Sequence, residues 1–138
     1  MKEIVSKIGK INKNDEGVYN YLSDFRNLNS IIPEDKIKNW EAGEDECEFT
    51  IDGFGKAGMK IVEKEPNKLI KISSYKETPF DFNLWLQLKK IKENDTRIRI
   101  TLKANLNPLM DAMVSKHLQK GVDAIVDKLA DFFNSDNP

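Results

Sequence analysis

Apolar residues recur at three- and four-residue steps from Pro108 to Phe133, the longest regular pattern in the chain. They fall on one side of a helical projection, while lysines, aspartates and a glutamine fill the other side. The pattern predicts an amphipathic helix, which is about 39 Å long at the usual rise per residue. Asn107 is a suitable N-cap, and Pro108 suits the first helical position because its missing N–H has no partner there.

A period of two runs through most of the stretch from Lys36 to Asn107. Its cleanest segment is Phe80 to Leu88, where apolar and polar residues alternate, and Ile98 to Leu106 repeats the pattern. Turn signals rich in Gly, Pro, Asn and Asp divide the stretch into strands. One polar and one apolar face on each strand predict an antiparallel sheet that is covered on one side only.

The start of the chain predicts one further strand, from Lys2 to Asn12. Strict alternation places Ile4 and Ile8 on its inner face. Ser6 shares that face, so we expect a polar group pointing inward.

Two short helices are expected next. Asn14 or Asp15 caps the first of them, which carries its apolar residues at helical spacing. The second covers Arg26 to Ile32. It ends there because a residue that precedes proline, here Pro33, disfavours the helical region.

The expected order is therefore a strand, two short helices, six strands and a long helix, which is an α+β arrangement. A curved seven-stranded antiparallel sheet would wrap round the long C-terminal helix and bury its apolar stripe. We expect residues 1–138 to form a single domain of this kind. A sheet that grips one helix tends to leave a cavity between the two, because it does not fill its own interior.

The chain resembles the START-like, or SRPBCC, superfamily in this order of elements. It also resembles that superfamily in two segments, VYNYLSDFRNLNSIIP after the first strand and NPLMDAMVSKHLQKGVDAIVDKLADFF at the end. Members include birch-pollen-allergen-like proteins, lipid-transfer domains, polyketide cyclases and coenzyme-Q-binding proteins. The resemblance implies a helix-grip fold whose cavity accepts a hydrophobic or amphipathic small molecule. No catalytic residue carries over, because members differ in cavity lining. The chain lacks the glycine-rich loop of the plant members, and only the short segment Gly53–Gly55 is similar to it.

The charge, the apolar runs and the cysteine content of the chain indicate which partners and which compartment to expect. Charged residues make up 33% of the chain and the net charge is −1, without a basic field of the kind that attracts phosphate backbones. We therefore expect no nucleic-acid partner. Neither a signal-peptide region nor an apolar run of membrane-spanning length is present, so no stable membrane insertion is expected. The single cysteine, Cys47, indicates a reducing compartment, and we expect a cytoplasmic location.

Few side chains suggest catalysis. His117 is the only histidine and lies at the edge of the helical stripe, where it is either structural or orients a ligand. Cys47 has no basic neighbour in sequence to lower its pKa and is expected to be a small buried hydrophobe. No metal-ligand spacing occurs, so we expect no metal, no cofactor and no assignable catalytic residue.

Two other residue types leave alternatives open. Gly121 lies inside the long helix at a cost of up to about 1 kcal/mol relative to alanine, so it permits the close approach of a strand, leaves room for a ligand, or is a packing glycine that the helix tolerates. Trp40 and Trp85 are expected on the solvent face of the sheet. There Trp85 would meet a partner chain or pack on a lysine stem.

We expect the protein to bind a lipid, quinone or polyketide as a carrier or sensor, because ionisable residues are scarce on its apolar faces. A cyclase- or hydratase-type enzyme that uses the same cavity is the first alternative. A protein-interaction module like the chaperone-ATPase activators of this fold is the second, and a weak homodimer remains open. The expected ligand-binding residues are Ile8, Phe49, Met59, Ile72, Ser74, Phe82, Leu84, Ile100, Met110, Met113, Val114 and His117.

Overall fold

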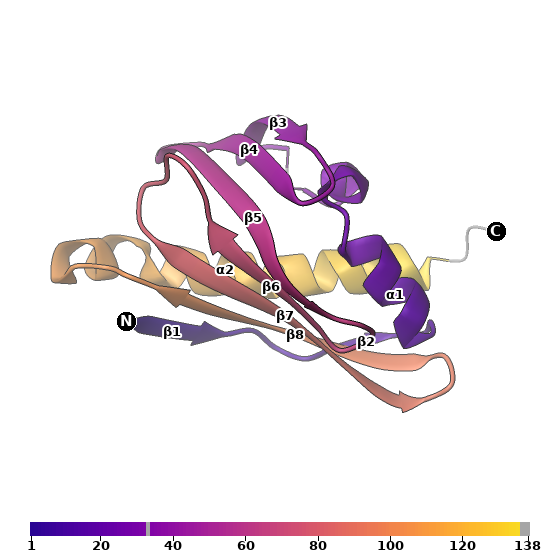
Figure 1. The fold of residues 1–138 in the computed structure, drawn as a ribbon. Coiled ribbons are helices and arrows are strands. Elements are labelled where there is room, and N and C mark those ends of the chain that lie inside the picture. Colours follow the sequence, from indigo (N-terminus) through magenta and orange to yellow (C-terminus); the bar gives the residue numbers. More distant parts are fainter. Residues whose placement is uncertain (33, 136–138) are drawn as a thin grey trace.

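A curved antiparallel sheet packs against one long C-terminal helix in the computed structural model, which describes residues 1–32 and 34–135 (Figure 1). A short α-helix and a 3-10 helix cover one end of the sheet. In chain order the elements are β1 Lys2–Val5, β2 Gly9–Ile11, α1 Asp15–Leu22, η1 Phe25–Ser30, β3 Ile37–Ala42, β4 Glu46–Ile51, β5 Gly55–Glu65, β6 Leu69–Ser74, β7 Phe82–Lys92, β8 Asp95–Ala104 and α2 Pro108–Asn134.

The strands follow one path across the sheet, β1-β8-β7-β6-β5-β4-β3, and β2 continues alongside β8. All neighbouring pairs are antiparallel. The predicted α+β helix-grip arrangement is therefore confirmed, including the order of strand, short helices, six strands and long helix. Neither α1 nor α2, the α-helices of the described residues, has the unbroken apolar length that crossing a bilayer requires.

The long helix begins where the sequence predicts. The Asn107 side chain accepts a hydrogen bond from the backbone N–H of Met110 at 2.8 Å, and Pro108 occupies the first turn. The second short helix forms as a 3-10 turn rather than an α-helix. It ends at Ser30, two residues before the predicted end at Ile32, and Pro33 lies outside the described residues.

The first strand departs from the prediction because it is interrupted between Val5 and Gly9. Ser6 stays inward, where its hydroxyl accepts a hydrogen bond from the Ile100 N–H at 2.8 Å. The interruption then shifts the alternation by one residue, so that Gly9 and Ile11 face the core. Ile8 consequently turns outward and is 63% exposed, and its predicted inward placement is wrong.

Residues in and beside this interruption hold α2 against the edge of the sheet. The Lys7 backbone N–H donates to the Asp123 carboxylate at 2.7 Å, and the Lys7 ammonium contacts Asp127 at 2.8 Å. The hydrogen bond to Asp127 raises the pKa of Lys7 above its ordinary value. Beside it, Gly9 lies so close to α2 that an added Cβ would be 2.6 Å from Val126 Cγ1. Only a residue without a side chain lets the helix approach this strand so closely.

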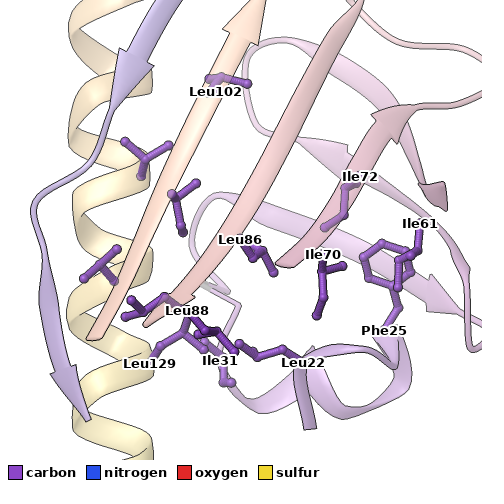
Figure 2. Packing of buried hydrophobic residues seen from close by; sticks show 14 of the residues in the cluster. Leu22, Phe25, Ile31, Ile61, Ile70, Ile72, Leu86, Leu88, Leu102 and Leu129 are labelled. Atoms are coloured by element: carbon purple, nitrogen blue, oxygen red, sulfur yellow. The ribbon is translucent and has the colours of Figure 1, made fainter. Parts of the chain in front are cut away.

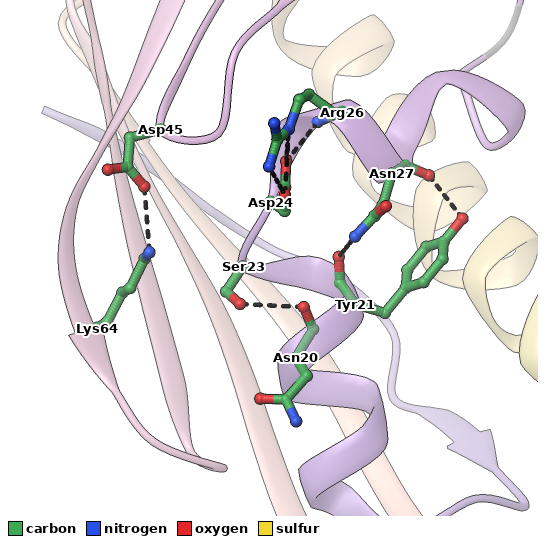
Figure 3. A network of polar contacts seen from close by, with 8 residues as sticks. All are labelled: Asn20, Tyr21, Ser23, Asp24, Arg26, Asn27, Asp45 and Lys64. Carbon is green, nitrogen blue, oxygen red and sulfur yellow. Dashed lines mark hydrogen bonds and ion pairs between the residues drawn. The ribbon is translucent and has the colours of Figure 1, made fainter.

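Polar contacts hold the bend between α1 and η1 (Figure 3). Asp24 caps η1 by accepting from the Arg26 N–H at 2.9 Å, and its carboxylate also pairs with the Arg26 guanidinium at 2.7 Å. This pairing lowers the pKa of Asp24. The Tyr21 hydroxyl donates a hydrogen bond to the backbone carbonyl of Asn27. The Asn27 side-chain amide in turn donates to the backbone carbonyl of Tyr21. These local bonds position Phe25, at the start of η1, over the sheet.

Buried hydrophobic side chains fill the end of the sheet that carries α1 (Figure 2). There Leu22 of α1, Leu88 of β7 and Leu129 of α2 lie side by side, and Phe25 reaches Ile61 of β5. Together they close the sheet at this end. Burial of this kind contributes roughly 25 cal/mol for each Å² of apolar surface removed from water.

The close approach at Gly9 makes a testable prediction. Gly9→Ala forces β2 and α2 apart and should lower the free energy of unfolding by about 1–3 kcal/mol, the usual effect of overpacking. Gly17→Ala in α1 is the control, because an added Cβ there meets no atom within 4 Å. It should raise stability by up to about 1 kcal/mol through helix propensity. Chemical denaturation of both variants checks the opposite signs, and equal effects would contradict the packing described.

Candidate functional site

The inner face of the sheet is covered unevenly. Helix α2 packs on β1, β2 and β8, which form one edge of the sheet, and α1 packs on β7. The strands β5, β6 and the beginning of β7 lie beyond the edge that α2 covers. At the end away from α1 and η1, this part of the inner face therefore depends on its own side chains for burial.

Four inward residues there are only half-buried. Met59 and Ser74 are opposite each other in the β5–β6 register, and Leu84 is opposite Ile72 in the β6–β7 register. Phe82 lies beside them, because its N–H donates to the Ser74 hydroxyl at 3.1 Å. We call this group, Met59, Ser74, Phe82 and Leu84, the open end.

The beginning of α2 lies at the same end of the fold. Phe82 is opposite Ala104, the last residue of β8, and α2 starts four residues later at Pro108. Met110 is half-buried on this first turn. Figure 1 shows the first turns of α2 extending beyond the sheet.

Other predicted site residues are packed into the core instead. Ile72 and Ile100 are buried on the inner face, and Val114 is the first fully covered residue of α2. Phe49 is buried beneath Trp40, with the ring centroids 5.5 Å apart. These side chains form the floor behind the open end and hold the sheet together.

Two predicted site residues of α2 are not brought to the inner face. Met113 is 62% exposed and His117 is also exposed. At 3.6 residues per turn, Met113 lies on the side of α2 away from the line of Val114, Val122 and Leu129, and His117 lies at the edge of that line, about one turn after Val114. Their predicted inward placement is wrong because the buried stripe is narrower than the apolar stripe of the sequence.

Trp40 is a residue of the inner face that the sequence reasoning placed outside. A bulge between Lys38 and Glu41, with Asn39 at φ 58°, shifts the alternation by one residue and turns the indole inward. The ring packs against Phe25 and Phe49. Its Nε1–H is buried and has no hydrogen-bond partner among the described residues. A polar asparagine able to adopt a left-handed conformation is the one signal for this bulge in the sequence.

Solved structures share this architecture at low sequence identity. A START superfamily protein from Mycobacterium smegmatis matches with a TM-score of 0.77 and 13% identity, over 95% of this chain and 96% of that one. The Aha1 dimer from Colwellia psychrerythraea matches with 0.69 and 18%, over 100% of both chains. Norcoclaurine synthase from Thalictrum flavum, in complex with dopamine and hydroxybenzaldehyde, matches with 0.75 and 11%, over 99% and 88%. No family model and no curated protein sequence matches the chain.

The chain has the START-like helix-grip fold. The resemblance in fold that the sequence suggested is thereby confirmed. At these identities the likeness concerns the fold alone, so the chemistry of the site rests on this chain's own residues.

The polar groups near the open end of this START-like fold are few. Ser74 accepts from the Phe82 N–H, as described above, and Cys47 is opposite Met59 in the β4–β5 register. Burial raises the pKa of the Cys47 thiol from 9.0 to about 12, so the thiolate is not formed at neutral pH. Within residues 1–32 and 34–135, no group of three or more His, Cys, Asp or Glu side chains is arranged to hold a metal ion.

Two shallow depressions lie outside the helix–sheet interface. One of about 280 Å³ is bordered by Glu41, Glu46 and Glu48 of β3 and β4 and by Tyr75. The other, of about 320 Å³, surrounds Trp85 on the outer face. Neither lies between α2 and the inner face, so the cavity expected there stays a prediction.

Because the inner face of the sheet is covered unevenly, substitutions at different positions of β7 should lower stability by different amounts. Leu86 is 7% exposed, whereas Leu84, two residues away on the same face, is half-buried. Leu86→Ala should lower the free energy of unfolding by about 2–5 kcal/mol, the range for a buried leucine. Leu84→Ala should cost less than half as much, since fewer contacts are lost. Equal losses in urea unfolding would show that the open end is as well packed as the core.

The Cys47 environment makes a second prediction. In the folded protein the thiol should not react with an aromatic disulfide reagent at about pH 8, because both burial and the raised pKa oppose thiolate formation. Unfolding in urea should restore full reactivity. The raised pKa favours folding below the ordinary thiol pKa of 9.0, and this stabilisation is lost as the pH rises from there toward 12. Rapid labelling of the native protein would contradict this placement.

Proposed function

We propose that the protein binds a hydrophobic or amphipathic small molecule at the open end, as a carrier or sensor. The observation that carries this proposal is the half-buried apolar surface of Met59, Phe82 and Leu84 on an otherwise well-covered inner face. Apolar surface that folding leaves uncovered is a common mark of a binding site.

The side chains at the open end suit an apolar ligand. Met59 and Met110 are unbranched and flexible, so they adjust to ligands of different shape. Phe82 adds an aromatic face, and the Phe80 ring lies 6.0 Å from it. A ligand inserted between Met110 and Phe82 would remove these surfaces from water. Affinity would therefore come from burial and shape, with the Ser74 hydroxyl orienting a polar group.

Structural neighbours agree with a site of this class. Norcoclaurine synthase holds two small aromatic molecules, dopamine and hydroxybenzaldehyde, in its complex. Another neighbour is a di-domain ARO/CYC protein, BexL, from a biosynthetic pathway. These proteins support binding of a small, largely apolar molecule, and they leave its identity to experiment.

Binding without catalysis accounts best for the residues present. Of the ionisable candidates that the sequence offers, Cys47 is held as a neutral thiol and His117 is exposed to solvent on α2. An acid–base pair for a cyclase or hydratase is therefore missing from the described residues of the open end. We place the carrier first and the enzyme second, in a reducing, cytoplasmic setting that fits the single cysteine.

A ligand of the native state should raise the melting temperature by mass action. We suggest 1-anilinonaphthalene-8-sulfonate and oleic acid as probes, with dye fluorescence and thermal unfolding as the readouts. Free ligand at a hundredfold excess over Kd stabilises a protein by about 2.7 kcal/mol. Met110→Glu should abolish the dye signal and the thermal shift, because it puts a charge where the apolar ligand would lie.

Met113→Glu is the matched control. It introduces the same charge one turn further along the same helix, on a side chain that is already 62% exposed. This variant should bind both probes like the unmodified protein. If neither probe shifts the melting temperature, or if both variants weaken binding equally, the open end is not the binding site.

A further inference from the structure

The outer face of the sheet carries a concentrated group of cations. Lys71 is opposite Trp85 in the β6–β7 register, and Trp85 is opposite Thr101 in the β7–β8 register. Arg99 and Lys103 flank Thr101 along β8, on the same face. We call Lys71, Trp85, Arg99 and Lys103 the basic patch.

Two ammonium groups share one aromatic ring in this patch. Lys71 Nζ lies 5.3 Å and Lys103 Nζ 5.5 Å from the centroid of Trp85. The ring attracts each cation, which fixes the indole between two lysine stems. This confirms the expectation that Trp85 lies on the solvent face and packs on a lysine. It also holds two like charges close together, and among the described residues neither makes an ion pair within 4.0 Å.

Carboxylates balance the patch only in part: Glu63 is opposite Lys71 and Glu3 is opposite Lys103, whereas Arg99 is opposite the neutral Gln87. Lys89, Arg97 and Lys10 are opposite one another across β7, β8 and β2. Like charges directly opposite in a sheet are destabilising, so folding alone does not favour this arrangement. Only Arg97 is neutralised there, by Asp95 at 3.0 Å. The chain as a whole carries a net charge of −1, which makes the cationic face a local feature.

The patch is also hollowed. A depression of about 320 Å³ is lined by Trp85, Arg99, Lys103 and Val5, together with Gln87, Thr101 and Glu3. Val5 is 40% exposed at its edge. The Gln87 amide oxygen accepts from both Arg99 and Thr101, so the floor is held rigid. A space of this size fits a few side chains of an extended segment.

We propose that the basic patch binds an acidic segment of a partner protein. Carboxylates would pair with Lys71, Arg99 and Lys103, and one apolar or aromatic side chain would pack on Trp85 beside Val5. Tryptophan and arginine at the centre of a hollow are the residues that contribute most to protein interfaces. Complementary charge would steer the encounter and make it salt-dependent.

Charge complementarity favours a protein segment over other anions. The patch is short, because Glu63 and Glu3 lie at its two sides, opposite Lys71 and Lys103, so a long phosphate backbone would meet repulsion there. A membrane surface would need protruding apolar side chains, and the patch offers only Val5. The patch faces away from the open end, so this proposal is independent of small-molecule binding.

Nuclear magnetic resonance with isotope-labelled protein tests the proposal. The probe is a ten-residue peptide of glutamates around a central phenylalanine, compared with the same peptide carrying glutamines. The chain has two tryptophans, and the inward-facing Trp40, whose Nε1–H is buried, is an internal control for Trp85. We expect a saturable shift of the Trp85 indole signal with the glutamate peptide only, weakened by added salt, while the Trp40 signal stays in place.

Charge variants complete the test. Lys103→Gln should weaken peptide binding by about two- to fivefold, the effect of one exposed ion pair. Lys38→Gln removes the same charge from β3, away from the patch, and should leave binding unchanged. Equal effects of the two variants, an equal response to the glutamine peptide, or no Trp85 shift would overturn the proposal. Stronger binding of a DNA duplex or of phosphatidylserine vesicles would overturn it as well.

Discussion

The interruption between β1 and β2 determines how the rest of the fold closes. It places Lys7 where its backbone N–H and its ammonium both reach carboxylates of α2, and it places Gly9 against Val126. Further along, Asn134 of α2 donates to the Lys10 carbonyl at 2.9 Å. The helix is thus tied to one edge of the sheet by bonds to the backbone. A helix held at the edge cannot also cover the strands beyond it.

The two ends of the inner face differ as a consequence. At one end α1 and η1 supply Leu22 and Phe25, which fill the space that α2 does not reach. No comparable element covers the other end within residues 1–32 and 34–135, so Met59, Phe82 and Leu84 stay half-buried. The same architecture therefore yields a packed end that provides stability and an open end that is available for a ligand. The outer face is a third, separate surface, distinguished by charge rather than by burial.

Much of this architecture is predictable from the sequence because its periods are long and clean. The alternation from Phe82 to Leu88 and the cap at Asn107 predict elements that form as expected. The errors arise at single extra residues. Both Ile8 and Ile11 are apolar, so the sequence pattern cannot show where the first strand shifts its alternation. Asn39 shifts β3 in the same way and brings Trp40 inside. Met113 illustrates another limit, because the width of the buried stripe depends on how far the sheet curls round the helix.

Native-state hydrogen exchange along α2 tests the central claim that the helix is anchored by its later turns. The amides from Val122 to Leu129, which lie beside the Lys7 contacts and the packed end, should exchange only with global unfolding. Those from Leu109 to Met113, where both side chains are largely exposed, should exchange much faster through local opening. Uniform protection along the whole helix would contradict the account, because it would mean that the open end is closed as firmly as the rest.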